Sequence, residues 1–406
     1  MRETTPRSET ADLARRRALR GLGAIGLTAL AGRAAAAQTV VAPAVPPSVI
    51  TSPARQWGQG APPSVYPDPD VVIIDPSFRQ ALVGNTQIRR VWTGATWAEG
   101  PAWSSQGQYL VFSDVVASKQ YRFNWDTRHV SVFRDPSFNS NGNSFDFQGR
   151  QLSAQHFFRR VVRWEHDGTM TVIADKFDGK YLNSPNDLVP HPDGSIWFTD
   201  PPYGTSLSEG HPDLAGGPSN PAGLFNPRIG TQDLAGIGGQ KRELPNAVYR
   251  WDPNGRLDAV ITEEQLKDPN GLCFSPDYKT LYVCSTGRGP GDAHDGGTRT
   301  IFAFDVQGTK PVNGRPFLDM TVDGVKTGPD GVRVDTAGRI WCSASGPLGY
   351  AGVLVYNAEA KLIGRVRLPE ICANLAFGGP KRNQLFMTAS QSLYLLQVQA
   401  QGAAPG

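Results

Sequence analysis

Residues 184–204, SPNDLVPHPDGSIWFTDPPYG, have the pattern of a β-hairpin, in which a strand, a tight turn and a second strand follow one another. The two strands would bury apolar side chains such as Leu188 and Phe198. The first strand nevertheless opens with Asn186 and Asp187, two side chains that resist burial. A polar pair in front of a buried strand needs an explanation, and the rest of the sequence supplies one because the hairpin is repeated.

The hairpin pattern occurs six times along the chain, and in five copies a turn residue lies eight positions after the first residue. The copies begin at Glu99, Asn141, Asn186, Asn270, Asp330 and Asn374. A third strand pattern follows every copy and a fourth follows the first five, while residues 86–94 have the pattern of the missing strand. These repeats predict an all-β fold, a six-bladed β-propeller closed by an N-terminal strand. A β-sandwich is the competing architecture, but it does not explain six copies in one register.

The first 37 residues have the pattern of a cleaved export signal. Arg15, Arg16 and Arg17 precede a glycine-containing apolar stretch that is too short to span a bilayer, and this resembles a twin-arginine signal for the bacterial periplasm. Removing residues 1–37 takes away seven arginines and three acidic residues, so the formal charge falls from +3 to −1. The mature chain therefore has no basic stripe that predicts a nucleic acid or a membrane as its partner.

The remaining chain divides into three predicted parts. Residues 38–80 are rich in proline and predict a linker or an arm on the domain surface, residues 81–398 form the propeller, and residues 399–406 form a tail. The cysteines lie within apolar strand patterns at Cys273, Cys284, Cys342 and Cys372. They predict buried free thiols, although a disulfide between Cys273 and Cys284 stays open in an oxidising compartment.

The direction of the strands places the start of each inner strand at the same face of the propeller as the end of the second strand. Long insertions at 201–246, 286–298 and 344–352 join second strands to third strands at this face, whereas the opposite connections are mostly short turns. Functional loops are expected on the elaborated face. The polar first residues would converge there around the central channel, so Asn186 need not be buried among apolar groups.

The converging residues are two carboxylates, Glu99 and Asp330, and four asparagines. Oxygen ligands without cysteine or paired histidine favour a hard cation such as Ca²⁺, with Mg²⁺, Mn²⁺ and Zn²⁺ as alternatives. A divalent cation would also remove the repulsion between the carboxylates. The competing interpretation is that Asn-Gly and Asp-Gly pairs mark turns, because four of the six residues precede glycine.

Residues 87–398 resemble the gluconolactonase, regucalcin and senescence marker protein family of calcium-dependent six-bladed propellers. The motifs that carry the resemblance are WAEGPAWS (97–104), NSPNDLVPHPDGSIWFTDPPYG (183–204), DPNGLCFSPD (268–277) and GPDGVRVDTAGRIW (328–341). The resemblance implies four metal ligands, of which Asn186 is the weakest or is bridged by water: Glu99, Asn186, Asn270 and Asp330. It also implies that Asp330 is the general base or nucleophile. Regucalcin-like members have an arginine where this chain has Ser184, so the sugar preference stays open.

The predicted function is that of a periplasmic lactonase acting on sugar lactones such as gluconolactone. Ca²⁺ would hold the developing oxyanion, and Asp330 would orient or activate water, although a carboxylate bound to a dication is a weak base. Motifs of serine hydrolases, zinc proteases and nucleotide hydrolases are missing from the sequence. One alternative is attack on phosphorus by Asp330 as nucleophile, as in the related diisopropyl fluorophosphatases. The other is a non-enzymatic exported propeller that binds a ligand or a protein.

Several further residues are candidates for substrate binding at the same face: Asn141, His156, Ser184, Asp187, Tyr203 and Asn374. His156 could relay a proton, bind substrate or serve as a hydrogen-bonded structural residue. Tyr203 could form a substrate wall or be a packed aromatic residue, and Asp187 is expected to fix its loop. The insertion at 201–246 could form a partial lid or a solvated loop.

Overall fold

The computed structural model describes residues 49, 55–58, 60–63, 65–204, 242–287 and 297–403. Contacts divide the chain into Met1–Ala42 and Pro43–Gly406, and every described residue belongs to the second unit. The predicted export signal lies outside the described residues, as do most of the 201–246 and 286–298 insertions and the last three residues of the predicted tail. No helix in the described ranges is long and apolar enough to cross a membrane.

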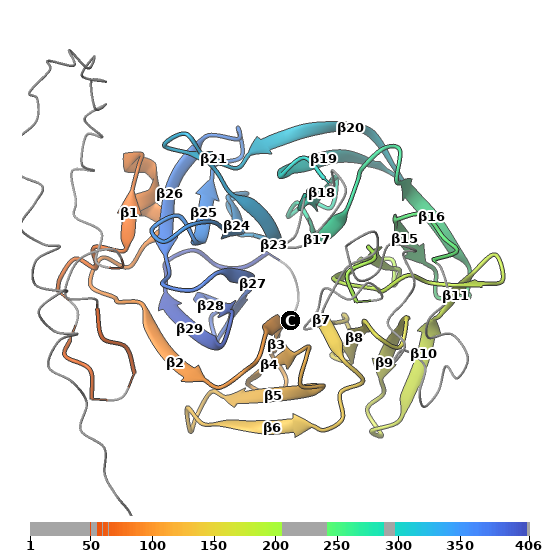
Figure 1. Ribbon diagram of the computed structural model, residues 1–406, viewed down its shortest axis with the longest axis horizontal. Coiled ribbons are helices and arrows are strands. Elements are labelled where there is room, and N and C mark those ends of the chain that lie inside the picture. The colour runs from red at the N-terminus through yellow and green to blue at the C-terminus, as the bar shows by residue number, and fades with distance from the viewer. Residues whose placement is uncertain are drawn as a thin grey trace, which may run out of the picture. The chain divides into compact units, whose positions relative to one another are not determined.

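The unit Pro43–Gly406 contains six antiparallel sheets that form the blades of a propeller around a central axis (Figure 1). Blade 1 contains β3 (Ala98–Ser104), β4 (Tyr109–Asp114), β5 (Lys119–Asn124) and β6 (Val130–Arg134). Blade 2 contains β7 (Ser140–Phe145), β8 (Gln151–Gln155), β9 (Arg160–Trp164) and β10 (Met170–Ala174). Blade 3 contains β13 (Leu188–Pro190), β14 (Ile196–Asp200), β15 (Ala247–Trp251) and β16 (Leu257–Thr262).

The other three blades complete the ring. Blade 4 contains β17 (Pro269–Phe274), β18 (Thr280–Ser285), β19 (Thr300–Gln307) and β20 (Lys310–Asp319). Blade 5 contains β23 (Gly328–Val334), β24 (Ile340–Ser345), β25 (Gly352–Tyr356) and β26 (Leu362–Arg367). Blade 6 contains β27 (Cys372–Gly378), β28 (Gln384–Ala389), β29 (Ser392–Gln397) and β2 (Arg89–Thr93). Two short hairpins lie between blades: β11 (Lys176–Phe177) with β12 (Lys180–Tyr181), and β21 (Thr321–Val322) with β22 (Val325–Lys326).

The ring is closed by a strand from the beginning of the domain, as predicted. In blade 6, β2 pairs antiparallel with β29, so that Arg89 lies opposite Leu395 and Arg90 opposite Tyr394. Strands from the beginning and the end of the domain therefore form one sheet. The prediction of an all-β, six-bladed propeller closed by an N-terminal strand is confirmed.

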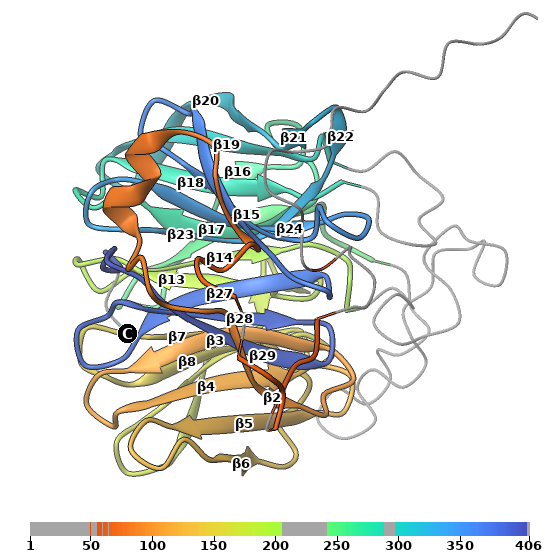
Figure 2. The same cartoon turned by 90° about the vertical axis from the view of Figure 1, so that its left-hand side faces the viewer.

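Part of the proline-rich segment at 38–80 packs on blade 5. Strand β1 (Val71–Ile73) pairs with β26 and makes this the one five-stranded sheet among the described residues. The 3-10 helix η2 (Pro76–Ala81), orange in Figure 2, contacts β26. Before β1, the Arg55 guanidinium lies 3.0 Å from the Asp68 carboxylate, and Asp70 pairs with Arg367 at 3.3 Å.

The hydrophobic core lies mainly between neighbouring blades. Blades 6 and 1 share one cluster in which the Trp103 and Phe386 rings stack with centroids 6.0 Å apart. Blades 3 and 4 share another, in which Trp197 meets Phe274 edge to face. The four cysteines are free thiols buried in these layers, as predicted. Each blade is thus stabilised chiefly by apolar contact with its neighbours.

The inner strands approach one another so closely that several of their residues must be glycine. A Cβ atom on Gly271 would lie 2.2 Å from the carbonyl oxygen of Asp330, and one on Gly331 would lie 2.1 Å from Oδ1 of Asn374. Both glycines lie inside strands, β17 and β23. The interpretation that these glycines mark turns is therefore wrong, because they allow close packing of strands.

Replacing Gly271 with alanine should strain the contact between blades 4 and 5. We expect Gly271→Ala to lower the free energy of unfolding by about 1–3 kcal/mol, the usual cost of overpacking. Gly84→Ala is the matched control, because the nearest atom to its new Cβ would be Oη of Tyr66 at 3.9 Å. Urea unfolding measures both. Equal stability of the two variants would contradict the close-packing argument.

Candidate functional site

The inner strands are irregular at the end where they begin, which we call the mouth of the propeller. Register shifts that mark β-bulges or similar irregularities occur there in five of the six inner strands. The shifts lie between Glu99 and Ala102, Ser140 and Asn143, Pro269 and Leu272, Pro329 and Val332, and Cys372 and Asn374. A bulge re-aims side chains and is common next to active sites. Five of the six predicted polar residues therefore lie at or beside positions where the regular alternation of the strand is broken.

Backbone contacts bring these polar residues together from different blades. A Cβ atom on Gly100 would lie 1.9 Å from the carbonyl oxygen of Asn141, so blades 1 and 2 touch directly behind Glu99. Blades 2 and 3 are joined because the N–H of Gly142 donates to the carbonyl oxygen of Asn186 at 2.8 Å. On the other side of the ring, Gly271 and Gly331 connect Asn270, Asp330 and Asn374 in the same way. We call the six predicted residues the mouth residues.

The two mouth carboxylates act on one shared neighbour, the thiol of Cys372. Burial raises the pKa of this thiol well above its usual value, and the charges of Asp330 and Glu99 raise it further. Asp330 lies in β23 of blade 5 and Glu99 in β3 of blade 1, so the two carboxylates come from inner strands of different blades. Asp330 is partly exposed, whereas Glu99 and the four asparagines are buried. Of the mouth residues, Asp330 is the one most open to a substrate.

His156 bridges two mouth residues. Its Nδ1 lies 3.5 Å from Nδ2 of Asn141, and its Nε2 lies 3.4 Å from Nδ2 of Asn186. Gly204 packs against the ring, because a Cβ atom at that position would lie 2.6 Å from Cγ of His156. The side chain is fully buried, and burial lowers the pKa of His156 to about 3. The imidazole is therefore neutral.

A neutral imidazole carries one N–H, so it can donate to one carboxamide and must accept from the other. Oδ1 of Asn141 is buried and has no hydrogen-bond partner among the described residues. A half-turn of that carboxamide places Oδ1 toward Nδ1–H of His156 and satisfies both groups. Nε2 then accepts from Asn186, which leaves the Asn186 oxygen directed away from the histidine. This arrangement suits Asn186 as an oxygen ligand.

The Asp187 carboxylate lies below the mouth, where an arginine and two hydrogen-bond donors contact it. The Arg333 guanidinium lies 3.3 Å from Oδ2 of Asp187, and the Asn374 carboxamide donates to the same oxygen at 3.4 Å. Oδ1 accepts from the N–H of Leu188 at 2.9 Å. Asp187 is fully buried, so the structure places both it and Asn374 in a network that links blades 3, 5 and 6.

Ser184 anchors the start of the third-blade insertion. Its hydroxyl donates to the carbonyl oxygen of Pro201 at 2.6 Å and accepts from the N–H of Gly204 at 3.0 Å. The serine is fully buried, and Tyr203 next to Gly204 is partly buried. The rest of the predicted lid, residues 205–241, lies outside the described residues. The substrate-binding roles assigned to these side chains stay predictions.

The mouth residues have the chemistry of a hard-cation site. They combine two carboxylates with carboxamide oxygens, and in the described part of the chain no group of three or more His, Cys, Asp or Glu side chains could hold a metal ion by itself. Such a donor set fits Ca²⁺ better than Zn²⁺. The orientation that His156 gives to Asn186 supports the same fit. The donor chemistry of the mouth residues therefore fits a divalent cation.

The fold and the mouth can now be compared with known proteins. The SMP-30/Gluconolactonase/LRE-like region family matches residues 97–391. The chain belongs to this family. The gluconolactonase of Zymomonas mobilis is 28% identical over 347 residues, which cover 80% of this chain and 85% of that protein.

Solved structures of similar proteins extend the comparison. A gluconolactonase from Xanthomonas campestris is 29% identical with a TM-score of 0.65, over 83% of this chain and 97% of that one. A calcium-binding regucalcin from Agrobacterium tumefaciens is 18% identical with a TM-score of 0.56, over 77% and 95% of the two chains, and shows that the fold is shared.

Two features of this family member were missed by sequence reasoning. Arg333 was not recognised as the partner of Asp187, although a charged residue between Val332 and Val334 in an inner strand was a usable signal. Asp200 was also missed. It ends β14, is fully buried, and accepts from the N–H of Asn183 at 2.8 Å.

The Asp200 carboxyl gives the family member a testable pH dependence. Burial raises the pKa of Asp200 to about 7, against the opposing effects of the Asn183 N–H and the Arg159 charge. The folded state then holds a proton that the unfolded state has released, so this group's stabilisation is complete at low pH and is lost as the pH rises through about 7.

We expect the stability of the unmodified protein, relative to the Asp200→Asn variant, to fall as the pH rises from about 4 to about 7. The slope should reach up to about 1.4 kcal/mol per pH unit. Urea unfolding of both proteins across this range measures the difference. A difference that does not change with pH would show that Asp200 titrates normally.

Proposed function

We propose that the protein hydrolyses sugar lactones such as gluconolactone with the help of a divalent cation of the Ca²⁺ type. That it is a lactonase follows from its family and from relatives named gluconolactonase. The cation, its ligands and the mechanism are our proposal. The observation that supports them most strongly is the close backbone contact between inner strands beside the proposed ligands, where a Cβ atom on Gly271 would lie 2.2 Å from the carbonyl oxygen of Asp330.

The residues that would hold the cation are Glu99, Asn186, Asn270 and Asp330. A bound cation would supply positive charge to polarise the lactone carbonyl and stabilise the oxyanion. Calcium is the first candidate because the ligands are oxygen atoms, and a structural relative is named as a calcium-binding protein. The neutral His156 holds Asn141 and Asn186 in place for this task.

Asp330 is proposed as the catalytic residue. Its partial exposure lets the carboxylate reach a water molecule at the mouth, and a carboxylate accepts a hydrogen bond that orients the water toward the carbonyl carbon. Attack by the water and cleavage of the ring C–O bond release a hydroxy acid. The remaining predicted contacts with substrate, Asn141 and Tyr203 among them, belong to the walls of this site.

The location of the enzyme is a second part of the proposal. We infer that residues 1–37 direct export to a bacterial periplasm by the twin-arginine route, because Arg15, Arg16 and Arg17 precede a short apolar stretch. The mature enzyme would then act on a small lactone without a nucleic acid or membrane partner.

Replacing Asp330 with asparagine should abolish most turnover while the propeller stays folded. We expect kcat for glucono-1,5-lactone to fall by about 10²–10⁴-fold at saturating Ca²⁺, the range that general acid–base groups contribute. Asp277→Asn is the control, because Asp277 lies in an exposed hairpin turn. Acid release measures turnover, and circular dichroism checks the fold. More than a tenth of the normal kcat in the folded Asp330 variant would rule out this role.

Removing His156 should weaken cation binding, because Asn186 loses the hydrogen bond that orients its carboxamide. We expect His156→Ala to raise the Kd for Ca²⁺ by about 10–100-fold, as loss of an outer hydrogen-bond partner commonly does. His129→Ala changes an exposed histidine and serves as the control. Calorimetric titration with Ca²⁺ measures both, at a temperature where circular dichroism shows each protein folded. An unchanged Kd would mean that His156 is only a packing residue.

A further inference from the structure

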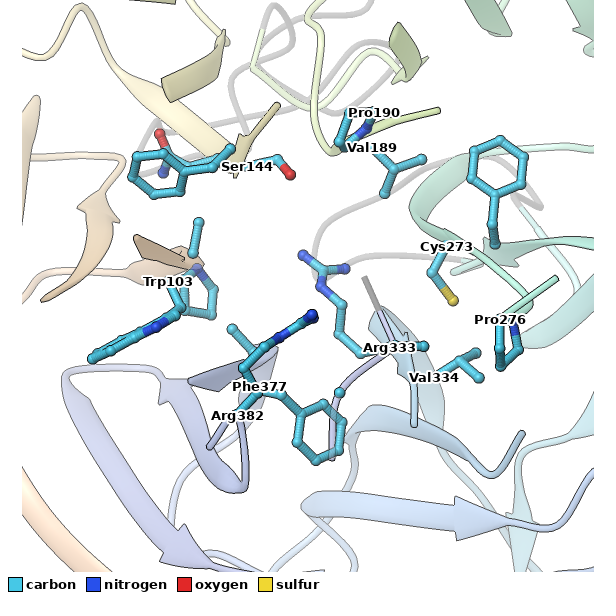
Figure 3. Close-up of a pocket in the computed structure, with 18 of the residues that line it drawn as sticks. Trp103, Ser144, Val189, Pro190, Cys273, Pro276, Arg333, Val334, Phe377 and Arg382 are labelled. Carbon is cyan, nitrogen blue, oxygen red and sulfur yellow. The ribbon is translucent and has the colours of Figure 1, made fainter. Parts of the chain in front are cut away.

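A pocket lies at the end of the propeller opposite the mouth, where the hairpins of the inner strands turn. Every blade contributes to its lining, through residues such as Trp103, Ser144, Val189, Cys273, Arg333 and Phe377 (Figure 3). Each of these residues follows a mouth residue by three or four positions, a separation of about 10 Å along a strand. We call this cavity the hairpin-end pocket. It is separate from the proposed lactone site.

The walls of the hairpin-end pocket are largely apolar, but two arginine side chains extend into it. Figure 3 shows Arg333 and Arg382 reaching toward the middle from blades 5 and 6. No Asp or Glu is present among the described residues that line the pocket. Apolar walls with a few convergent polar groups are typical of sites for small molecules. The sign of those groups here favours an anion.

The two guanidinium groups differ in how their charge is balanced. Arg333 is paired with Asp187 toward the channel interior at 3.3 Å. Nε of Arg382 is buried and has no hydrogen-bond partner among the described residues. Burial lowers the pKa of Arg382, and the phenol of Tyr278, not a carboxylate, opposes that shift. A partly buried cation without a counter-charge is costly, so the pocket carries one positive charge that is not balanced.

The backbone holds Arg382 in this position. The N–H of Gly402 donates to the carbonyl oxygen of Arg382 at 3.0 Å, and the N–H of Arg382 donates to Gly379 at 2.8 Å. The cavity has a volume of about 50 Å³, and about 10–15 Å³ is enough to hold one water molecule. The pocket therefore has room for a ligand the size of a few water molecules.

We propose that the hairpin-end pocket binds a short-chain aliphatic carboxylate, with the carboxylate group on Arg382 and Arg333 and the hydrocarbon chain against Trp103 and Phe377. Guanidinium groups present paired donors that match a carboxylate. The apolar walls favour a ligand with a hydrocarbon body over inorganic phosphate or a polyhydroxylated sugar acid. The site also lies beside the Arg333–Asp187 pair, which leads through Asn374 to the mouth.

Butyrate is the probe, titrated by calorimetry into the full chain at constant ionic strength after divalent cations have been removed. Cation-free conditions separate this test from the proposed lactonase mechanism, which needs the cation. We expect butyrate to bind at least tenfold more tightly than its neutral isostere butyramide and than inorganic phosphate. Equal binding of butyramide would overturn the role of charge, and equal or tighter binding of phosphate would overturn the assignment to a carboxylate.

Variants test which arginine carries the site. We expect Arg382→Met to weaken butyrate binding at least tenfold and Arg382→Lys to retain more of the affinity, because lysine keeps the charge. Arg256→Met is the control, since the Arg256 side chain is 68% exposed at the surface. Arg333 is left intact because its loss would strand the buried Asp187. Unchanged butyrate affinity in Arg382→Met would overturn the proposal, and the butyrate–butyramide comparison decides it independently if that variant does not fold.

Discussion

Close packing of six inner strands around one axis is the constraint on which the rest of the structure depends. Where two strands touch at the mouth, one of them carries glycine, as Gly100 does against Asn141 and Gly271 against Asp330. A larger residue at these positions would collide with the neighbouring backbone. The same closeness brings together the backbone segments of neighbouring blades that carry the polar mouth residues. The fold thus creates the chemical site by the way it closes.

The close packing also places carboxylates near the centre of the propeller, and their negative charge is balanced in two ways. Below the mouth, the buried Asp187 is balanced by Arg333, a cation built into the chain. At the mouth, Glu99 and Asp330 lie on inner strands of different blades, and we propose that an external cation balances them. Beyond Arg333, the guanidinium of Arg382 adds a positive charge that no carboxylate among the described residues balances. This charge favours the binding of an anion. The change from acidic groups near the mouth to arginines at the other end therefore connects the lactonase proposal with the hairpin-end pocket.

The fold could be predicted because each blade has the same spacing between turn residues and apolar runs. Both features depend on interactions between residues close in sequence. The closing strand at 86–94 was found in the same way and corresponds to β2. The pairing of Val71–Ile73 with β26 could not be foreseen, since three residues give no periodic signal. Strand direction predicted that the mouth residues share one face of the propeller, but their individual contacts could not be predicted. Register shifts re-aim side chains, so the bridge made by His156 and the pairing of Arg333 with Asp187 required coordinates. Ser184, likewise, bonds to a loop that sequence reasoning could not place.

The central claim is that a divalent cation at the mouth makes the propeller a lactonase. The most direct measurement is hydrolysis of glucono-1,5-lactone by the purified mature chain, followed as acid release after chelation and again after Ca²⁺ is added back. The account predicts that activity disappears with the cation and returns with it. Full activity in protein shown to be free of divalent metal would contradict the account.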